Sequence, residues 1–368
     1  MNEKTQPCTH CGAVHPRVNL TWMGSAELCP ECLQRYTVCC DCCGERIWMA
    51  NDYGTHYLHL CASCRADNYV TCENCGALIP QEDAHYNDED EAYCDSCYER
   101  GYGGTIHNYS YKPEPIFYGD GPLYLGVELE VDEAGKDNIN AVQALQAFNQ
   151  ENVYGYVKSD GSLNDGFELV THPCTLETHL QQVPWRETLE ALRGMGYRSH
   201  APGTCGLHVH VSRKALGKDV YEQEETIAKL LYIFERFWQE ILRFSRRTES
   251  QINHWAARYG YKDRGEEILK EAKHGANGRY ACINLTNTDT IEFRVFRGTL
   301  KYNTVIATLQ FVANLYRVAI SLPEYRIQEF SWPALIEALT QDNCPELVQY
   351  LKERNLYVNE PVTAEREV

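Results

Sequence analysis

The chain contains no uninterrupted run of about 18 apolar residues, so the sequence predicts no transmembrane helix. Its first five residues lead into polar sequence and cysteines, without the apolar core of a signal peptide. Positive charge is scarce, because 34 Lys and Arg stand against 52 Asp and Glu and the formal net charge is −18. This balance argues against broad affinity for nucleic-acid phosphates or anionic membranes. We therefore expect a cytoplasmic protein that binds neither a membrane nor nucleic acid.

Cysteine is the residue that the chain has in excess. Fourteen of the 18 cysteines lie before residue 100, and the remainder are Cys174, Cys205, Cys282 and Cys344. In a reducing cytoplasm such clustering indicates metal binding rather than disulfides. The 368 residues are enough for two or three domains.

The clustered cysteines form a threefold repeat. A CxxCG motif begins at Cys8, Cys40 and Cys72, 32 residues apart both times, and a second CxxC pair follows each after 17, 17 and 18 residues. Two such pairs supply four thiolates for a tetrahedral zinc ion, and the glycine permits a left-handed turn. The predicted ligands are Cys8, Cys11, Cys29 and Cys32 for the first zinc, Cys40, Cys43, Cys61 and Cys64 for the second, and Cys72, Cys75, Cys94 and Cys97 for the third.

The middle site has an alternative, since Cys39 and Cys42 are also spaced as CxxC and can replace Cys40 and Cys43. Redox-active thiols and disulfides are the rival interpretations of the whole cluster. Four-thiolate zinc sites leave no open ligand position, so we expect a structural role. A unit of about 30 residues buries too little core to fold alone, and zinc binding then supplies the folding free energy.

The cysteine-rich region is also acidic, because residues 1–105 hold 6 Lys and Arg against 16 Asp and Glu. Each zinc ion held by four thiolates adds formal negative charge. We therefore predict a surface that docks a protein or presents a substrate, in preference to one that binds nucleic acid. A purely structural cap is the alternative.

The sequence changes character after residue 100. Residues 101–120 are rich in Gly, Tyr and Pro and are predicted to be a linker, which separates zinc repeats at 1–100 from a domain at 121–368. In this domain, hydrophobic periodicity predicts an α+β fold with a frayed tail after Val358. The predicted strands are Leu123–Val131, Tyr154–Val157, Phe167–Thr171, Leu207–Ser212, Arg279–Leu285 and Thr290–Phe296. The predicted helices are Asn138–Asn149, Leu176–Met195 with an interruption near Pro184, Glu222–Phe244, Thr304–Ser321 and Trp332–Arg354.

Four segments of this domain place charged side chains on one face of a strand, because the side-chain period of a strand is two. They are GVELEV with Glu128 and Glu130, KSDGSL…GFELVTHP with Lys158, Asp160, Ser162 and Glu168, GLHVHVS with His208 and His210, and IEFRVFRGTL with Glu292, Arg294 and Arg297. Taken singly, each is compatible with an exposed edge strand, a solvated turn, structural histidines or a salt bridge. Together they are typical of a sheet that binds metal ions and phosphate.

These segments, in this order, resemble the amidoligase family, which belongs with the glutamine synthetase and glutamate–cysteine ligase group of carboxylate–amine ligases. The resemblance covers roughly residues 121–310 and leaves the zinc region outside. It implies a glutamine synthetase-like antiparallel sheet with flanking helices. It also implies an ATP-dependent ligase that makes an amide bond through an acyl phosphate, and the lack of a Walker A motif is consistent with that group.

The resemblance further implies roles for individual residues. Glu128, Glu130, Glu168, His208 and Glu292 match magnesium ligands, and Arg294 matches a catalytic phosphate-binding residue. Lys158, Asp160, Ser162, His210 and Arg297 match positions that approach the substrate or phosphate. The implied cofactors are Mg²⁺ and ATP, and the substrates are a carboxylate and an amine, one of which can be a peptide or protein presented by the zinc region.

Other functions remain open at this point. The chain can be a non-catalytic adaptor for protein interactions, or an ATP-independent zinc hydrolase that uses His208 and His210 with a glutamate. Cys205, near His208, is a candidate nucleophile, although a buried structural cysteine is the better explanation. The sequence does not specify the two substrates, the oligomeric state or the partner of the zinc region.

Overall fold

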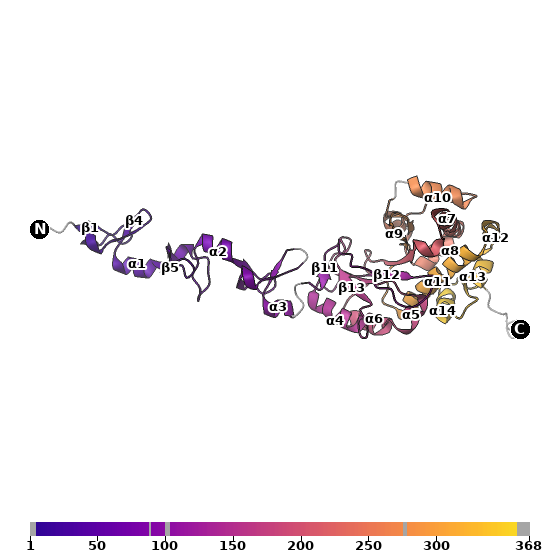
Figure 1. Ribbon diagram of the computed structural model, residues 1–368, viewed down its shortest axis with the longest axis horizontal. Coiled ribbons are helices and arrows are strands. Elements are labelled where there is room, and N and C mark those ends of the chain that lie inside the picture. Colours follow the sequence, from indigo (N-terminus) through magenta and orange to yellow (C-terminus); the bar gives the residue numbers. More distant parts are fainter. Residues whose placement is uncertain (1–4, 88–89, 100–103, 275–277, 359–368) are drawn as a thin grey trace. The chain divides into compact units, whose positions relative to one another are not determined.

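A computed structural model of the protein describes residues 5–87, 90–99, 104–274 and 278–358. The chain divides into two compact units after Gly104 (Figure 1). The tail predicted to fray after Val358 lies outside the described residues.

The first unit repeats one small motif, in which a hairpin carries the CxxCG turn and a short helix follows the second CxxC pair. The strands are β1 (Thr5–Pro7), β2 (Val14–Pro16), β3 (Thr21–Met23), β4 (Ala26–Leu28), β5 (Thr37–Cys39), β6 (Arg46–Trp48), β7 (Tyr69–Thr71), β8 (Leu78–Pro80), β9 (His85–Tyr86) and β10 (Ala92–Tyr93). The helices are α1 (Pro30–Tyr36), α2 (Ala62–Asn68) and α3 (Asp95–Glu99), with 3₁₀ turns η1 (Arg17–Asn19), η2 (Met49–Asn51) and η3 (Gln81–Asp83).

The glycine of each CxxCG turn has the backbone conformation that the sequence predicted. Its φ angle is +76° at Gly12, +76° at Gly44 and +70° at Gly76, in the left-handed region that glycine adopts without strain. The apolar core of each repeat is very small and consists largely of the cysteines themselves. The first two cores also include a side chain from the following repeat, since Trp48 packs on the first cluster and Leu78 packs on the second. This packing leaves zinc as the main source of folding free energy.

The second unit contains a seven-stranded sheet within residues 105–274 and 278–358, in the order β11-β13-β14-β12-β15-β17-β16. Its strands are β11 (Ile106–His107), β12 (Leu125–Val131), β13 (Gly155–Lys158), β14 (Phe167–Thr171), β15 (Leu207–Ser212), β16 (Ile283–Asn284) and β17 (Thr290–Phe293). The pair β11–β13 is parallel, and the other pairs recorded in this sheet are antiparallel. The mixed helix-and-sheet class therefore agrees with the prediction, and the antiparallel pattern holds from β13 to β16.

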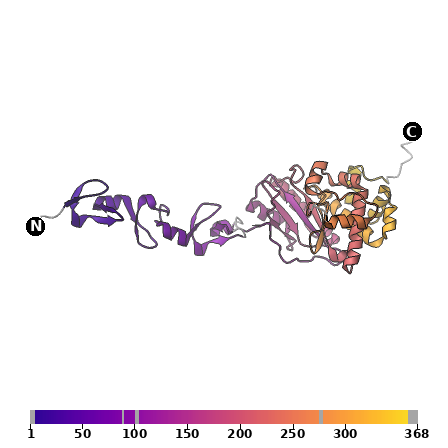
Figure 2. The same ribbon diagram turned by 90° about the horizontal axis from the view of Figure 1, so that it is seen from above.

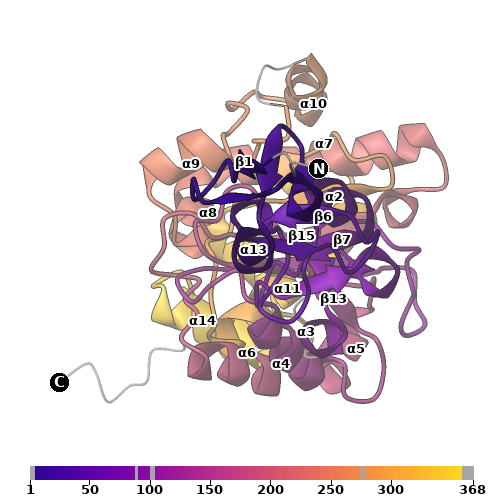
Figure 3. The same ribbon diagram turned by 90° about the vertical axis from the view of Figure 1, so that its left-hand side faces the viewer.

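The second unit also contains helices, some of which contact the sheet. They are α4 (Asn138–Phe148), α5 (Leu176–Gln181), α6 (Trp185–Gly194), α7 (Val220–Arg236), α8 (Trp238–Ser245), α9 (Glu249–Trp255), α10 (Gly265–His274), α11 (Tyr302–Ser321), α12 (Glu324–Gln328), α13 (Trp332–Leu339) and α14 (Pro345–Glu353), with one 3₁₀ turn, η4 (Arg213–Leu216). Helix α4 contacts β13, and α11 contacts β15. In Figure 2 the orange and yellow helices lie to one side of the magenta strands. Figures 1 and 3 show α4, α5 and α6 near one edge of the sheet and α7, α9 and α10 near the other.

Helix α11 is the central helix of this core. Its length and composition would also allow it to cross a membrane, but 83% of its apolar window is buried inside the fold. The residues that bury it include the chain's own aromatic side chains, such as Phe244, which stacks on Phe311 at 4.2 Å between ring centroids. A core helix of a folded unit accounts for these observations.

The segment predicted as a linker is partly folded in the structure. Residues Ile106 and His107 form the edge strand β11, and the backbone N–H of Ser159 donates to the carbonyl of His107 at 2.8 Å. Farther along, the backbone N–H of Tyr118 donates to the carbonyl of Pro173 at 3.0 Å. A strand of two residues is too short to show periodicity in the sequence, and this explains the difference from the prediction.

Two predicted helical segments are broken in the structure. The segment Glu222–Phe244 becomes α7 and α8 because Phe237 leaves the helical conformation, with φ −105° and ψ 34°. The segment Trp332–Arg354 becomes α13 and α14, and Pro345 begins the second of them. In the first case the apolar stripe continues across the break, so hydrophobic periodicity alone could not locate it.

A buried histidine makes the stability of the second unit dependent on pH. The Nε2 atom of His179 lies 3.1 Å from the carbonyl oxygen of Leu125, and its Nδ1 accepts a hydrogen bond from Trp185 Nε1 at 3.4 Å. This arrangement holds the neutral ring, and burial lowers the pKa of His179 from 6.5 to about 4. The unfolded chain takes up the proton first, so this contribution is complete above pH 6.5 and is lost as the pH falls toward 4.

We expect the unfolding free energy to fall by about 2 kcal/mol through this histidine when the pH is lowered from 8 to 5. Urea unfolding followed by tryptophan fluorescence measures it, since Trp185 contacts the histidine. The variant His179→Gln lacks this titrating group but keeps all the others. The decisive quantity is therefore the difference between the wild type and His179→Gln in how much unfolding free energy is lost from pH 8 to pH 5. An identical pH dependence in the two proteins would contradict the assignment.

Candidate metal and phosphate site

The charged strand residues lie on the open face of the sheet because their apolar neighbours are used by the core. Val127, Leu129 and Val131 are fully buried under the helices, and Glu128 and Glu130 alternate with them on β12. Strand pairing then sets the neighbours on the open face. Glu130 pairs with Glu168 on β14, Glu128 with His208 on β15, and His210 with Glu292 on β17.

Glu128 is the centre of this arrangement. His208 Nδ1 lies 3.1 Å from its Oε2, and His210 Nε2 lies 3.2 Å from its Oε1. His208 Nδ1 is also 3.4 Å from Glu292 Oε1, and its Nε2 is 3.9 Å from Glu130 Oε1. Both histidines are therefore within reach of the acids, whereas the resemblance had favoured His208 as the ligand.

At least two groups of side chains on this face could each hold a metal ion. One is Glu128, His210 and Glu292, and another is Glu128, Glu168 and His208. In each group the ligand atoms lie within 4.8 Å of one another, and Glu128 belongs to both. The geometry thus allows two cations side by side that share the Glu128 carboxylate.

The protonation of the acids fits a cation at this position. Burial raises the pKa of Glu168 well above its usual value, and the charge of Glu128 raises it further. Burial likewise raises the pKa of Glu130. At Glu128 burial acts in the same direction, but His210 and His208 outweigh it and hold the pKa well below the usual range. The carboxylates therefore lack matching positive charge, which a divalent cation would supply.

Positive side chains border the acids on both sides. Lys158 Nζ lies 3.3 Å from Glu168 Oε2, and both side chains are almost fully buried. At the other side, Arg294 Nη1 donates to Glu292 Oε1. Lys158 therefore lies beside the acids rather than in the solvent.

The turn after Lys158 is held by its own side chains. Both the backbone N–H and the hydroxyl of Ser162 donate to Asp160 Oδ1, at 2.7 and 2.5 Å. Asp132, which directly follows β12 and is 1% exposed, accepts from the N–H groups of Asn164 and Asp165 at 3.1 and 2.7 Å. Sequence reasoning did not include Asp132, although it fixes the turn that carries Asp160 and Ser162.

Arg297 is placed differently from the other predicted residues. Its Nη1 lies 3.5 Å from the carbonyl oxygen of Arg246, and Arg246 in turn donates to the carbonyl oxygen of Arg297. These contacts join the end of α8 to the chain after β17. Arg297 does not line the cavity that lies over the polar face, whereas Arg294 does.

A cavity of about 1240 Å³ lies over the polar face and is larger than the range of about 300–1,000 Å³ that small-molecule sites usually occupy. Its wall includes the segment 109–115, which the sequence assigned to a linker. Tyr109 lies across from Arg279, whose Nη1 donates to the tyrosine hydroxyl. Residues on its wall that the sequence had already singled out are Glu128, Glu130, Lys158, Asp160, Ser162, Glu168, His208, His210, Glu292 and Arg294.

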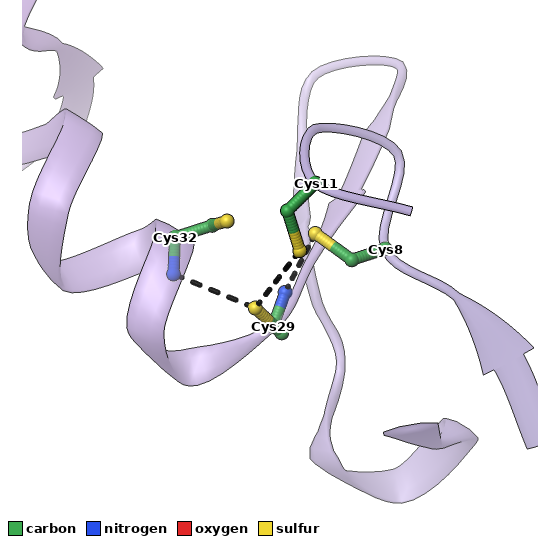
Figure 4. Close-up of side chains that lie close together, drawn as sticks. All are labelled: Cys8, Cys11, Cys29 and Cys32. Atoms are coloured by element: carbon green, nitrogen blue, oxygen red, sulfur yellow. Dashed lines mark hydrogen bonds between the residues drawn. The ribbon is translucent and has the colours of Figure 1, made fainter. Parts of the chain in front are cut away.

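The cysteines of the first unit form the predicted four-membered groups. All 18 cysteines lie in the described part of the chain, and none of them forms a disulfide. The groups are Cys8, Cys11, Cys29 and Cys32; Cys40, Cys43, Cys61 and Cys64; and Cys72, Cys75, Cys94 and Cys97. Figure 4 shows Cys8 and Cys11, on the first turn, facing Cys29 and Cys32 at the start of α1.

The spacing of the sulfur atoms fits zinc. The distances Cys11–Cys29, Cys43–Cys61 and Cys75–Cys94 are each 3.9 Å between Sγ atoms. A regular tetrahedron with Zn–S bonds of about 2.3 Å has edges of about 3.8 Å. At Cys40, hydrogen bonds from the backbone N–H groups of Cys61 and Cys43 support the thiolate form and lower the pKa to about 6.

In the middle repeat the structure groups Cys40 and Cys43 with the second pair, and Cys39 and Cys42 are exposed. Cys42 still lies near the site, since Asn68 Nδ2 is 3.8 Å from its Sγ and 3.3 Å from the carbonyl oxygen of Cys64.

In the second unit, burial raises the pKa of the Cys205 thiol to about 12. A thiol that resists ionisation is a poor nucleophile, which argues against that alternative.

Comparison with known proteins was made against families, curated proteins and solved structures. Residues 129–316, just over half of the chain, match the family described as "Putative amidoligase enzyme". The chain belongs to this family. The match begins one residue after Glu128 and contains Glu168, His208, His210, Glu292 and Arg294, whereas the cysteine repeats lie outside it.

The other comparisons add little. No curated protein matches the chain. Among solved structures, a bifunctional glutathione synthetase from Pasteurella multocida matches with 15% identity and a TM-score of 0.32, over 63% of this chain and 46% of that one. The chain thus spans less than half of that protein, and a likeness this low carries no argument about fold or function.

Several residues of this amidoligase-family site were missed by sequence reasoning. Tyr109 and Lys112 come from the supposed linker, and Trp255, Arg279 and Tyr280 come from α9 and the segment before β16. These positions are far apart in the sequence and carry no local pattern. The richness in tyrosine of residues 101–121 was the one available signal, and it was attributed to a linker.

Proposed function

We propose that this chain is an ATP-dependent carboxylate–amine ligase that forms an amide bond through an acyl phosphate. The observation that carries the proposal is the pair of candidate cation groups that share Glu128, with Lys158 and Arg294 beside them. Membership of the amidoligase family supports it. On this proposal the sheet and its helices correspond to the glutamine synthetase-like fold that the resemblance implies.

The proposed reaction has two steps. An oxygen of the substrate carboxylate attacks the terminal phosphorus of ATP, and the bond to the ADP oxygen breaks, with the electron pair leaving on ADP. The amine then attacks the acyl carbon, the bond from that carbon to the phosphate oxygen breaks with its electron pair leaving on phosphate, and the nitrogen gives up one proton, which the released phosphate takes up. The chain's task in both steps is to position the groups and to stabilise negative charge.

The residues have distinct proposed roles. Glu128, Glu130, Glu168, His208, His210 and Glu292 hold divalent cations, which supply charge neutralisation on the transferring phosphoryl group when bound. Arg294 contacts phosphate oxygens, and Lys158 attracts the substrate carboxylate. Tyr109 and Arg279, which meet across the cavity, limit the access of water to the acyl phosphate.

The zinc repeats are proposed to recruit a peptide or protein substrate. Their last cysteine, Cys97, precedes the cavity residue Tyr109 by twelve residues, so a bound partner would be tethered near the cavity. The size of the cavity leaves room for a polypeptide segment besides a nucleotide. On this view the first 104 residues raise the local concentration of the substrate without taking part in the chemistry.

Magnesium-dependent binding of ATP tests the proposal without knowledge of the substrate. We expect calorimetry to detect binding of MgATP to the zinc-loaded wild type and at least about tenfold weaker binding to Glu292→Ala, because one cation group loses a carboxylate. Glu190→Ala, on the exposed surface of α6, is the matched control for loss of a carboxylate and should bind like the wild type.

The outcome separates the main proposal from its rival. A folded, zinc-loaded wild type that binds no ATP with or without magnesium would refute the ligase. One observation favours a hydrolase as the second candidate, namely that each cation group combines one imidazole with two carboxylates, a set that zinc accepts. Hydrolysis of amide substrates in the absence of ATP, with zinc added, would favour that candidate.

A further inference from the structure

Arg247 is a buried guanidinium next to the metal face that neither the sequence analysis nor the proposed reaction has used. The residue is 6% exposed, and its Nε and Nη1 atoms have no hydrogen-bond partner among the residues that the structure describes. A guanidinium keeps its charge at all physiological pH values. Burying its N–H groups without acceptors costs free energy, so such a group indicates a position where an anion binds.

Gly206 places this guanidinium close to the acids and histidines. A Cβ atom at Gly206 would lie 2.9 Å from Arg247 Nη2 and 2.3 Å from His208 Nε2. The absence of a side chain at Gly206 therefore makes room for both groups. His208 and Glu130, which lie near Arg247, both line the cavity, whereas Arg247 itself is not among the residues of its wall.

The residue before Arg247 is held in an unusual backbone conformation. Arg246, the residue after α8, has φ +65°, a left-handed conformation that costs a non-glycine residue about 1 kcal/mol or more. Contacts on both sides hold it there. The Arg246 guanidinium donates to the carbonyl oxygen of Arg297, and Ser245 Oγ accepts the backbone N–H of Arg247 at 3.1 Å.

Arg247 has charged neighbours of both signs. Burial lowers the pKa of Arg247 to about 10, with Glu130 opposing the shift and Arg294 and Arg297 adding to it. Arg294 has its own partner, because it forms an ion pair with Glu292. No ion pair of Arg247 is found within residues 5–87, 90–99, 104–274 and 278–358. An anion with two or more oxygens would give the two unpartnered N–H groups of Arg247 their acceptors.

We propose that Arg247 binds the phosphoryl group that the ligase transfers, as a second guanidinium beside Arg294. The inference rests on the proposed ATP-dependent function and adds to it a specific contact. The transferring phosphoryl group carries its charge on three oxygens, which suits the fixed fork of an arginine better than a lysine ammonium. Arg247 would then hold these oxygens while the bond to ADP breaks and the bond to the carboxylate oxygen forms.

The difference between ATP and ADP tests this contact. MgATP and MgADP are titrated by calorimetry into the full-length, zinc-loaded wild type, Arg247→Gln and Arg247→Lys. We expect Arg247→Gln to weaken MgATP binding about tenfold or more and MgADP binding less than about twofold, because ADP lacks the terminal phosphoryl group. Arg247→Lys should show the same preference with a smaller loss. Arg193→Gln, at an exposed position of α6, controls for the loss of one positive charge.

Each outcome decides a separate question. Equal weakening of ATP and ADP, or no weakening of ATP, would overturn the assignment of Arg247 and leave the ligase proposal intact. Wild type that binds neither nucleotide would instead refute the ligase. If Arg247→Gln does not fold, as judged by the loss of a cooperative unfolding transition, Arg247→Lys replaces it because it keeps the charge. Its binding of MgATP and of MgADP is then compared with that of the wild type.

Discussion

Replacing Glu128 with glutamine should remove both cations from the polar face at once. Mn²⁺ is a spectroscopic probe for Mg²⁺ sites, and electron paramagnetic resonance counts the bound ions. We expect two Mn²⁺ ions per zinc-loaded wild-type chain. We expect fewer than one in Glu128→Gln, because Glu128 belongs to both groups. Phosphate release from ATP in the presence of mixed carboxylates and amines should fall at least about a thousandfold, which corresponds to about 4 kcal/mol of lost transition-state stabilisation.

Two further variants make this prediction specific. Glu168 and Glu292 each belong to one group, so Glu168→Gln and Glu292→Gln should each keep one of the two ions. Glu190→Gln removes an exposed carboxylate from α6 and should leave two ions and full phosphate release. Glutamine keeps the volume of the side chain, and cooperative unfolding is the check that the fold is intact. Two bound ions in Glu128→Gln would show that the shared carboxylate is not a ligand.

The face that carries these acids was predictable because alternation in a strand is a local property. The strand predicted over Leu207–Ser212 is β15 with the same bounds. Its apolar residues face the core, which leaves His208 and His210 for the open face. The same reasoning holds for β12 and β14. The resemblance to the amidoligase family then gave a functional meaning to the order of these segments, which their spacing alone does not provide.

The residues that the sequence did not reveal reach the site through tertiary contacts. Arg247 follows a helix and depends on the left-handed conformation of Arg246 and on the space beside Gly206. Tyr109 depends on the two-residue strand β11, whose parallel pairing with β13 joins residues 106–107 to 157–158. No periodic signal encodes either relation, because each links segments that are far apart in the chain.

The overlapping CxxC motifs of the middle repeat are a second case in which the sequence alone does not identify the residues of a site. Spacing favoured Cys40 and Cys43 through the 32-residue period, but Cys39 and Cys42 satisfied the same local rule. The fold distinguishes them because Cys40 is buried next to Cys61, whereas Cys39 ends β5 and faces outward. The position of the partner pair Cys61 and Cys64, and not the motif, decides which thiols meet.

Removing zinc should unfold the first unit and leave the second folded. The clusters around Cys8, Cys40 and Cys72 contain very few buried apolar side chains, so they cannot offset the conformational entropy of about 90 residues. Zinc held by thiolates contributes on the order of 10 kcal/mol per site in small units. The second unit has its own large core around α11 and needs no zinc for it.

Hydrogen exchange of the full-length chain measures this effect region by region. After chelation under reducing conditions, we expect amides of residues 5–99 to lose protection and those of β12, β15 and α11 to keep it. Cysteine variants then assign the ligands. Mass spectrometry of the metal content should give about three zinc ions for the wild type and Cys39→Ser, and about two for Cys40→Ser and Cys72→Ser.

The comparison of Cys39→Ser with Cys40→Ser is the sharpest part of this prediction, since the two changes are adjacent and chemically identical. Equal zinc content in these two variants would mean that the middle site accepts either CxxC pair. An unchanged content in Cys72→Ser would refute the third site. Persistent protection of residues 5–99 after complete zinc removal would show that the repeats fold through contacts between neighbours, such as that of Trp48 with the first cluster, rather than through metal.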